Sequence, residues 1–277
     1  MPDAHPPPFR TVCVVGTGMI GASVGLAARR MGCRVIGVDS SVDQARAALE
    51  CGAVDEVADS VPPAELVVIA VPVQHAAAVV RAVAETAAVI TDALSTKRTI
   101  YRLAAETGLR GRFVAAHPMA GRAESGPGAA AADLFEDRPC FVFPSGDAAN
   151  STRVADFWRR LGGARPMRVR DDLTPAAHDA LVARISHLPH AVAGALIRLA
   201  SDDLEQAGPG LRDSTRVARG DPDLWTPLLL DNADRVAPLL RAMGASLEEL
   251  AATLERGDAP ALRERLDEAR RRREALG

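Results

Sequence analysis

Short runs of β-branched and apolar residues alternate with Ala-rich segments over the first 168 residues. The strand-like runs are TVCVV (11–15), RVIGV (34–38), ELVVIAV (65–71), AVIT (88–91), RFVAA (112–116), CFVFP (140–144) and ARPMRV (164–169). Helical periodicity is expected over 19–31, 42–50, 75–85 and 151–161. This alternation predicts βαβ units, in which a parallel sheet is covered by helices on both faces.

The pattern changes at Asp171, after which no strand-like run of useful length occurs. The remaining segments have apolar residues at helical spacing, interrupted by Pro189, Gly208-Pro209-Gly210, Gly220-Asp221-Pro222 and Gly244. We therefore expect an α/β domain over 1–169 and an all-helical domain over 170–277. The helical domain has more apolar surface than a small lone domain can bury, which predicts a symmetric dimer.

Composition narrows the functional classes. The 277 residues are enough for two domains. Acidic residues outnumber basic ones by 36 to 33, which excludes the basic balance of a dedicated nucleic-acid binder. Aromatic residues make up only 3% of a chain that is 48% hydrophobic, so Ala, Val and Leu must form the core.

The first residues, MPDAHPPPFR, lack the basic start and apolar run of an export signal. Apolar stretches are interrupted by charge or proline before the roughly 18 residues that a membrane span needs, so we expect a cytoplasmic protein that does not bind membranes. The cysteines, Cys13, Cys33, Cys51 and Cys140, form no C-x-x-C pair. They are interpreted as small apolar residues, and no metal site is predicted.

A glycine-rich turn, Gly16-Thr17-Gly18-Met19-Ile20-Gly21, follows the first strand, and Asp39 ends the second. In a G-x-G-x-x-G turn the glycines permit a tight turn, close approach to a pyrophosphate and helix–strand packing, while the helix N-terminus attracts the anion. A carboxylate at Asp39 accepts hydrogen bonds from ribose hydroxyls and repels a 2′-phosphate, which favours NAD over NADP. The predicted cofactor site also includes Ala70, Val71, Pro72 and Asp92.

His117 follows the strand 112–116 directly, in the run His117-Pro118-Met119-Ala120-Gly121. The carboxyl ends of parallel strands face the ligand crevice, so an imidazole there is a candidate general base. The neighbouring strand ends in a segment that contains Ser95 and Lys97 at the same edge. Lys97 is the only lysine among 33 basic residues, which suggests a position that needs a compact ammonium group.

The helical half contains the pairs His178-Asp179 and His187/His190, and further on Asp213, Arg216 and Trp225. His187 and His190 lie three residues apart and share a helix face, where anion contact or core packing is favoured over metal binding. Arg216 is either a bidentate clamp for a carboxylate or half of a surface ion pair with Asp213.

These motifs together resemble the prephenate and arogenate dehydrogenase family. The resemblance rests on G-T-G-M-I-G, T-D-x-x-S-x-K, H-P-M-A-G, S-G-P (125–127), L-F-E (134–136), H-D-x-x-x-x-x-x-S-H-L-P-H and R-D-x-T-R-x-A-x-x-D-P-x-x-W. It implies an α/β Rossmann-type dinucleotide-binding domain, followed by an all-α dimerisation domain, and a homodimer. It also implies oxidative decarboxylation of a cyclohexadienol dicarboxylate: hydride passes from C4 to NAD⁺, a base takes the 4-hydroxyl proton, and loss of CO₂ aromatises the ring.

The resemblance also implies roles for individual residues. His117 matches the catalytic histidine that accepts the 4-hydroxyl proton, and Ser95 the serine that binds the same hydroxyl and orients that histidine. Arg216 matches the arginine that binds a substrate carboxylate. The rest of the implied substrate pocket is His187, His190, Asp213, Trp225 and Gly121.

Several positions depart from the family pattern. Leu94 and Ala123 stand where the family has Gly and Glu, with Glu124 one position late, and Pro209-Gly210 replaces a glycine. Prephenate is the leading substrate, and arogenate and 4-amino-4-deoxyprephenate are alternatives; the last is suggested by the changes at Leu94 and Ala123, which are expected beside the reacting C4. A non-catalytic NAD-binding regulator is the alternative from another class; a β-hydroxyacid dehydrogenase or imine reductase is disfavoured by H-P-M-A-G. No regulatory domain is expected after Gly277.

Overall fold

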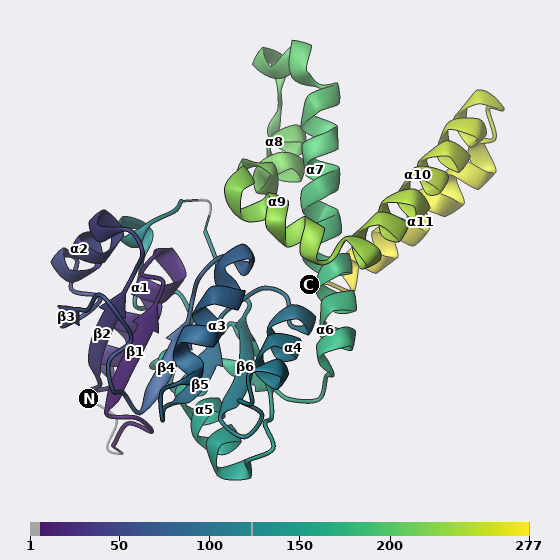
Figure 1. Cartoon of the computed structure of the whole chain (residues 1–277). Helices are drawn as coiled ribbons and strands as arrows, with labels where there is room; N and C mark the ends of the chain where they lie inside the picture. The colour runs from purple at the N-terminus through teal and green to yellow at the C-terminus, as the bar shows by residue number, and fades with distance from the viewer. Residues whose placement is uncertain (1–5, 123, 277) are drawn as a thin grey trace. The chain divides into compact units, whose positions relative to one another are not determined.

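The computed structural model describes residues 6–122 and 124–276. The chain forms two compact units that divide after Asn232. The first contains the sheet and the helices up to α9, and the second contains α10 and α11 (Figure 1). The predicted domain boundary at 169/170 falls at the end of the last strand, inside the first unit, and stays a prediction.

An eight-stranded sheet organises the described part of the first unit, in the order β3-β2-β1-β4-β5-β6-β7-β8. Its strands are β1 (Thr11–Val15), β2 (Arg34–Val38), β3 (Glu56–Val57), β4 (Leu66–Ile69), β5 (Val89–Asp92), β6 (Phe113–Pro118), β7 (Pro139–Phe143) and β8 (Arg168–Arg170). Neighbours are parallel except β6 and β7, which pair antiparallel. The parallel sheet that the βαβ units predicted is present, and the direction of β7, which the sequence did not indicate, is antiparallel because the chain returns from β6 to β7 without a crossover helix.

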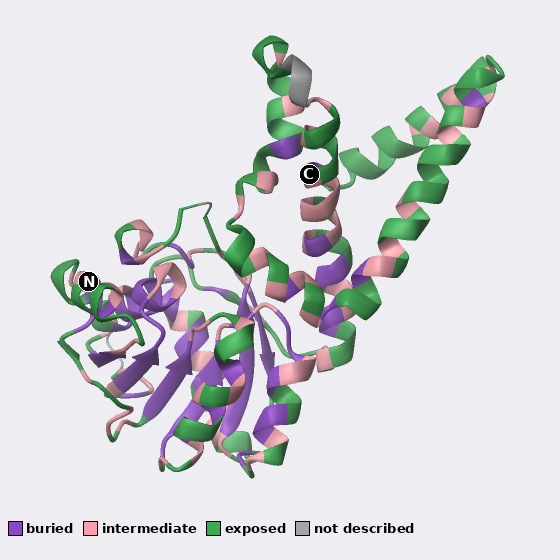
Figure 2. Cartoon of the chain, turned by 45° about the horizontal axis from the view of Figure 1, so that its top comes forward, coloured by how far each residue is buried: buried purple, intermediate pink, exposed green. Residues whose placement is uncertain are grey.

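Helices cover both faces of the sheet because successive residues of a buried strand point to opposite sides. Val12 and Val14 of β1 pack in one apolar cluster, with α1 (Met19–Arg30) and α5 (Ala148–Leu161). Their neighbours in β1, Cys13 and Val15, pack in the other, with α3 (Ala76–Ala84) and α4 (Arg98–Glu106). The central strands β4, β5 and β6 are accordingly buried along their length, whereas the edge strands β3 and β8 are largely exposed; Figure 2 shows the buried centre of the sheet.

The predicted strands and helices of this half are present, with ends that shift by a few residues. α2 (Val42–Glu50) has the predicted bounds, and a short turn, η1 (Val73–His75), precedes α3. The sequence pattern did not predict α4 or the two-residue strand β3. A second short turn, η2 (Pro127–Ala129), lies between β6 and β7.

The first unit continues as helices and turns. These are α6 (Pro175–Val182), the π-helical turn η3 (Ala183–His187), α7 (Leu188–Leu199), η4 (Ser201–Gln206), α8 (Pro209–Thr215), η5 (Arg216–Arg219) and α9 (Pro222–Asp231). Pro189 does not break this path, because it lies in the first turn of α7, where a missing N–H is tolerated.

The continuous helical path Pro175–Leu199 is long and apolar enough, by length and composition alone, to cross a membrane. Charge and proline interrupt this path, as predicted, at Asp179, Arg184 and Pro189, and the absence of membrane binding stays a prediction. Two of its polar residues, His178 and Asp179, are buried against the sheet, whereas Leu196 and Leu199 are exposed. A core helix that has one uncovered apolar face has the same length and apolar composition.

The second unit is a helical hairpin of α10 (Ala233–Glu255) and α11 (Ala259–Glu274). The turn uses Gly257 at φ +65°, a left-handed conformation that glycine adopts without strain. Asp258 then caps α11 by accepting a hydrogen bond from Ala261 N at 3.1 Å. Leu247, Leu254 and Leu266 remain exposed on this hairpin.

Candidate active site

The glycine-rich turn after β1 is required by backbone geometry. Gly16 has φ +91°, and a Cβ there would lie 2.6 Å from Ala70 O and 2.8 Å from Val71 Cγ1. A Cβ on Gly21 would lie only 1.9 Å from Gly16 O. Gly18, at the N-terminus of α1, has open space where its Cβ would be. The turn thus packs against the end of β4 on one side and offers helix N–H groups on the other, as a pyrophosphate needs.

Asp39, at the end of β2, is tied to this turn. Its Oδ2 accepts hydrogen bonds from Thr17 N at 2.6 Å and Thr17 Oγ1 at 3.0 Å, and its Oδ1 accepts one from Ser41 N at 2.9 Å. The carboxylate is only half-buried, so it is both fixed in position and accessible. A held acceptor in this place suits the ribose hydroxyls of a dinucleotide.

The other predicted cofactor residues separate into two groups. Met19 and Ile20 are half-buried in the first turn of α1, and the exposed Pro72 follows Ala70 and Val71 at the switch between β1 and β4. Asp92, in contrast, is fully buried and faces the protein interior. Its assignment to the cofactor site stays a prediction, and in this structure its side chain supports the sheet edge from beneath.

Asp92 and Lys97 form a buried ion pair beneath the sheet edge. Lys97 donates to the Asp92 carboxylate and to Ala116 O, while Asp92 accepts from Ala116 N and Leu94 N, both at 3.0 Å. Burial lowers the pKa of Lys97 below its ordinary value, although the Asp92 carboxylate opposes that shift. The pair joins the carboxyl ends of β5 and β6, and its narrow space suits a compact ammonium group.

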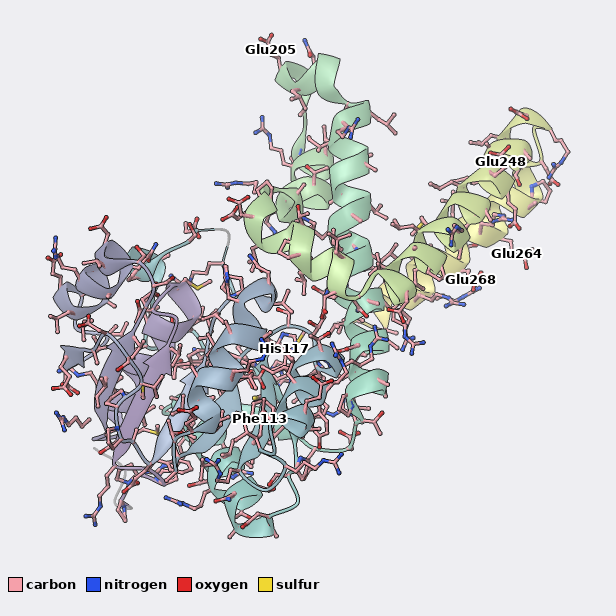
Figure 3. The ribbon with its side chains drawn as sticks, viewed as in Figure 1. Phe113, His117, Glu205, Glu248, Glu264 and Glu268 are labelled. Atoms are coloured by element: carbon pink, nitrogen blue, oxygen red, sulfur yellow. The ribbon has the colours of Figure 1, made fainter. Side chains whose placement is uncertain are left out.

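His117 lies at the carboxyl end of β6 and is only 8% exposed (Figure 3). Its Nδ1 is 2.9 Å from Nε2 of His178, and His178 Nδ1 is 3.0 Å from Asp179 Oδ1. Both partners come from α6. The sheet and the helical segment thus meet in a continuous line of three hydrogen-bonded side chains.

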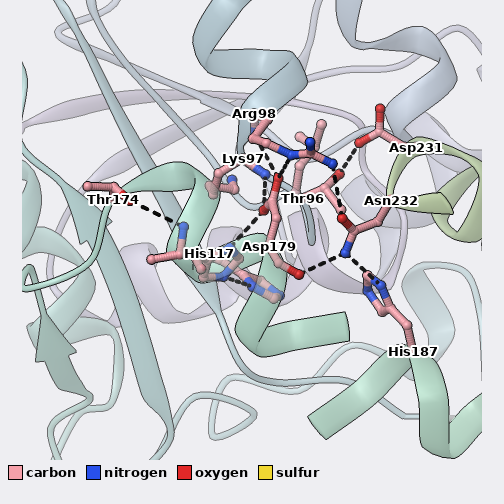
Figure 4. A network of polar contacts seen from close by, with 12 residues as sticks. Thr96, Lys97, Arg98, His117, Thr174, Asp179, His187, Asp231 and Asn232 are labelled. Carbon is pink, nitrogen blue, oxygen red and sulfur yellow. Dashed lines mark hydrogen bonds and ion pairs between the residues drawn. The ribbon is translucent and has the colours of Figure 1, made fainter. Parts of the chain in front are cut away.

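The Asp179 carboxylate is the centre of this network (Figure 4). It accepts from Lys97 N at 2.8 Å, Arg98 N at 2.9 Å and Arg98 Nε at 3.2 Å. Burial alone would raise the pKa of Asp179, but the hydrogen bonds from His178, Arg98 and Lys97 lower it below its usual value. Asp179 is therefore an ionised acceptor at neutral pH.

The histidines of the network are neutral at that pH. Burial, assisted by the nearby His178, Lys97 and His187, holds the pKa of His117 well below its ordinary value. Burial also lowers the pKa of His178, although Asp179 opposes the shift, and lowers that of His187 to about 4. A neutral His117 has a lone pair with which to accept a proton.

Two residues at the end of α9 complete the network. Asn232 Nδ2 donates to Asp179 O at 2.8 Å and lies 3.2 Å from His187 Nδ1. Asp231 accepts hydrogen bonds from Thr96 and Thr99, both at 2.6 Å. These contacts fasten α9 to the start of α4, beside the segment that contains Ser95.

The predicted substrate residues are only partly brought together. His190 stacks on Trp225, with ring centroids 3.5 Å apart and an interplanar angle of 7°, and His187 meets the same indole edge-on. Arg216, Asp213 and Gly121 are exposed. Within the described ranges Arg216 forms no ion pair with Asp213, so that interpretation of Arg216 is not supported.

Ser95 is half-buried, and its hydroxyl forms no hydrogen bond with the described residues. The side chain that contacts His117 is His178. The sequence analysis noted the pair His178-Asp179 but predicted no role for it. Leu94, read as a change beside the substrate, is instead buried in the apolar cluster with α3 and α4. Ala123, the other departure, lies outside the described residues.

The fold and the turn define a dinucleotide-binding protein of the Rossmann class. Family models give the same class and a narrower assignment: "Prephenate dehydrogenase, nucleotide-binding domain" matches residues 24–165, and "Prephenate dehydrogenase, dimerization domain" matches 174–268. The chain belongs to the prephenate dehydrogenase family of oxidoreductases, as its motifs predicted.

Known relatives span more than one named activity. The chain is 33% identical to a prephenate dehydrogenase of Bacillus subtilis, over 90% of this chain and 71% of the relative. It is 32% identical to a cyclohexadienyl dehydrogenase of Zymomonas mobilis, over 97% and 96%. The prephenate dehydrogenase of A. aeolicus, solved with hydroxyphenyl propionate and NAD⁺, superposes with a TM-score of 0.87 at 28% identity, covering 97% and 98% of the two chains. The nucleotide-binding domain and this complex support NAD as the cofactor.

Proposed function

We propose that this protein catalyses the NAD-dependent oxidative decarboxylation of prephenate to 4-hydroxyphenylpyruvate. The observation that carries the proposal is a neutral, buried His117 at the carboxyl end of β6, on the edge of the sheet where the glycine-rich turn also lies. A base at this edge can reach a substrate bound beside a nicotinamide ring.

Bound NAD⁺ supplies the hydride acceptor. In this mechanism His117 Nε2 accepts the proton of the 4-hydroxyl group as the C4–H bond breaks, and a carbonyl forms at C4. Cleavage of the C1–carboxylate bond then releases CO₂, and its electron pair aromatises the ring toward the C4 oxygen. His117 returns its proton to that oxygen, so the histidine ends each cycle neutral and no net proton is consumed.

The remaining predicted residues bind rather than react. Asp39 receives the ribose hydroxyls and favours NAD over NADP because its charge repels a 2′-phosphate. Ser95, whose hydroxyl makes no internal hydrogen bond within the described residues, contacts the substrate hydroxyl. Arg216 binds a substrate carboxylate through charge-assisted hydrogen bonds. His190 and Trp225 form one wall of the pocket, and His187, Asp213 and Gly121 complete the proposed set.

The choice among the three cyclohexadienol substrates depends on the two positions that depart from the family pattern, Leu94 and Ala123. The amino substrate was suggested by Leu94 and Ala123, and the burial of Leu94 in the core removes half of that argument. The test is NADH formation by purified protein with prephenate, arogenate and 4-amino-4-deoxyprephenate in parallel. The highest kcat/KM with prephenate supports the proposal; preference for either alternative replaces the substrate, and no turnover with any of them indicates a non-catalytic regulator.

His117→Asn tests the base directly. Turnover should fall by about 10²- to 10⁴-fold, the usual contribution of a general base, with NAD affinity unchanged. Arg216→Ala should instead raise KM by roughly 10- to 150-fold, the equivalent of about 1.5–3 kcal/mol for a charge-assisted hydrogen bond. Wild-type kcat in the first variant, or wild-type KM in the second, would contradict the assigned role.

We also propose that a second copy covers the exposed apolar helix positions and forms a homodimer. Leu196 and Leu199 of α7 are exposed in the first unit, and Leu247 and Leu254 of α10 in the second. The match to the family's dimerization domain, residues 174–268, includes all four. Sedimentation equilibrium should give a dimer, and Leu247→Glu should shift it toward monomer; a wild-type monomer contradicts this proposal.

The cytoplasmic location stays a prediction.

A further inference from the structure

His178 and Asp179 have no part in the mechanism so far, although both are buried in direct line with His117. We propose that they are positioning residues, which hold His117 in the single tautomer that has its proton on Nδ1 and its lone pair on Nε2. The proposal rests on the proposed role of His117 as the base, and it adds what makes that base competent before substrate binds.

The direction of the hydrogen bonds is set at Asp179. Two of its donors are the backbone amides of Lys97 and Arg98, which can only donate, and a third is the Arg98 guanidinium. Both carboxylate oxygens are therefore acceptors. His178 Nδ1, at 3.0 Å from Oδ1, must then be the protonated ring nitrogen of His178.

The direction of the hydrogen bond at His178 in turn sets the direction at His117. With its proton on Nδ1, a neutral His178 presents a lone pair at Nε2, 2.9 Å from His117 Nδ1. His117 Nδ1 must donate the proton of this hydrogen bond, which leaves Nε2 as the basic nitrogen. The opposite tautomer would place two lone pairs face to face in a buried site, at the full cost of two unsatisfied groups.

The surrounding side chains keep His178 from reversing. Its ring is fully buried and packs edge-on against Phe141 and Phe143, with centroids 5.1 and 5.4 Å away. Rotation of the imidazole would require both aromatic rings of β7 to move. The backbone, by way of Lys97 and Arg98, thus fixes a proton position two side chains away.

The experiment is ¹⁵N NMR of the protein labelled at histidine, since imidazole nitrogen shifts distinguish the two tautomers. The chain has only six histidines, so single substitutions assign each signal. At pH 7.5, without ligands, wild-type His117 should be protonated on Nδ1 alone. A wild-type His117 protonated on Nε2 overturns the proposal, whether or not any substrate turns over, so this readout is independent of the proposed reaction.

Asp179→Asn tests the origin of the order. The amide oxygen should take the place of Oδ2, where Arg98 N and Nε both donate, so the NH₂ group replaces Oδ1 and faces His178 Nδ1. This reverses both histidines and puts the proton of His117 on Nε2. We expect the His117 signal to move to that form and kcat to fall by about 10²- to 10³-fold, with KM within about 3-fold of wild type. An unchanged tautomer in a folded Asp179→Asn protein contradicts the proposal.

Two further variants separate positioning from stability. Thr174→Ala removes the N-cap of α6, where Thr174 Oγ1 accepts from Ala177 N at 3.2 Å, without touching the line of three side chains. It should lower the melting temperature and leave tautomer and kcat unchanged. His178→Gln retains an acceptor for His117 Nδ1 and should keep at least about 10-fold more kcat than His178→Phe, which has none. Equal losses in Gln and Phe, or a Thr174→Ala loss equal to either, would show a merely structural role.

Discussion

The glycine-rich turn and the His117 network are two polar regions of one unit, built at very different distances along the chain. Thr17 and Asp39, which are hydrogen-bonded at the turn, are 22 residues apart. His117 and His178 are 61 apart, Lys97 and Asp179 are 82, and Thr96 and Asp231 are 135. The turn depends on backbone shape and missing side chains, whereas the network depends on charged groups that meet only in the folded protein.

Removal of the buried Lys97 ammonium group, in the His117 network, should cause the largest loss of stability. Lys97→Met leaves the Asp92 carboxylate buried without its ion partner, which we expect to lower the free energy of unfolding by about 3–5 kcal/mol. Urea denaturation measures the loss. Arg165→Met is the matched control, because the exposed Arg165–Glu136 ion pair is screened by solvent and should contribute little to stability. A Lys97→Met protein as stable as that control would show that the buried pair is dispensable.

The turn is tested by adding a single methyl group at two glycines. Gly21→Ala places Cβ against Gly16 O and should cost about 1–3 kcal/mol of stability. Gly18→Ala meets open space and should cost no more than about 1 kcal/mol, yet weaken NAD binding because the methyl group occupies the path of the pyrophosphate. Thermal denaturation and NAD titration separate the two effects. Equal stability of both variants would contradict the packing role of Gly21.

Acid should destabilise the network while leaving the backbone of the turn intact. Burial lowers the pKa values of His117, His178, His187 and His190, so below the unfolded value of about 6.5 the unfolded chain binds protons that the folded protein does not. The free energy of unfolding should be level above pH 6.5 and fall as pH drops toward the folded values, which for His187 is about 4.

Each of the buried residues His117, His178 and His187 contributes a slope of at most about 1.4 kcal/mol per pH unit in that window, and the more exposed His190 contributes less. The charged groups around His117 act in both directions, because Lys97 adds to the shift of His117 while Asp179 and Asp92 oppose that of His178. Urea midpoints at pH 7.5, 6 and 5 measure the trend, and the exposed His75→Asn is the control. A level profile from pH 7.5 to 5 would show that these imidazoles are not held neutral.

The smallest expected change concerns cofactor choice at the turn. Asp39→Asn keeps an acceptor for Thr17 but removes the charge that repels a 2′-phosphate. The ratio of kcat/KM with NADP to that with NAD should rise by about 5-fold, close to 1 kcal/mol. Steady-state kinetics with both cofactors gives this ratio, and no change in it would remove Asp39 from cofactor selection.

The difference between the two regions also explains how far the sequence could be read. The residues of the turn could be predicted because local periodicity predicts the strands and the helix beside them. Gly16, Gly18 and Gly21 lie between the first strand and the first helix, and Asp39 follows the second strand. His178 and Asp179 are adjacent residues with no local indication that they meet His117, since that contact depends on where α6 packs. The antiparallel β7 and the buried Leu94 were missed for the same reason: strand direction and burial are set by tertiary packing.

Lys97 has one more consequence, for anyone who handles the protein. It is the chain's only lysine and is completely buried. A protease that cuts after lysine therefore has a single target bond, and that bond is protected until β5 and α4 separate. The rate of this one cleavage would report how often the centre of the molecule opens, without any label or engineered site.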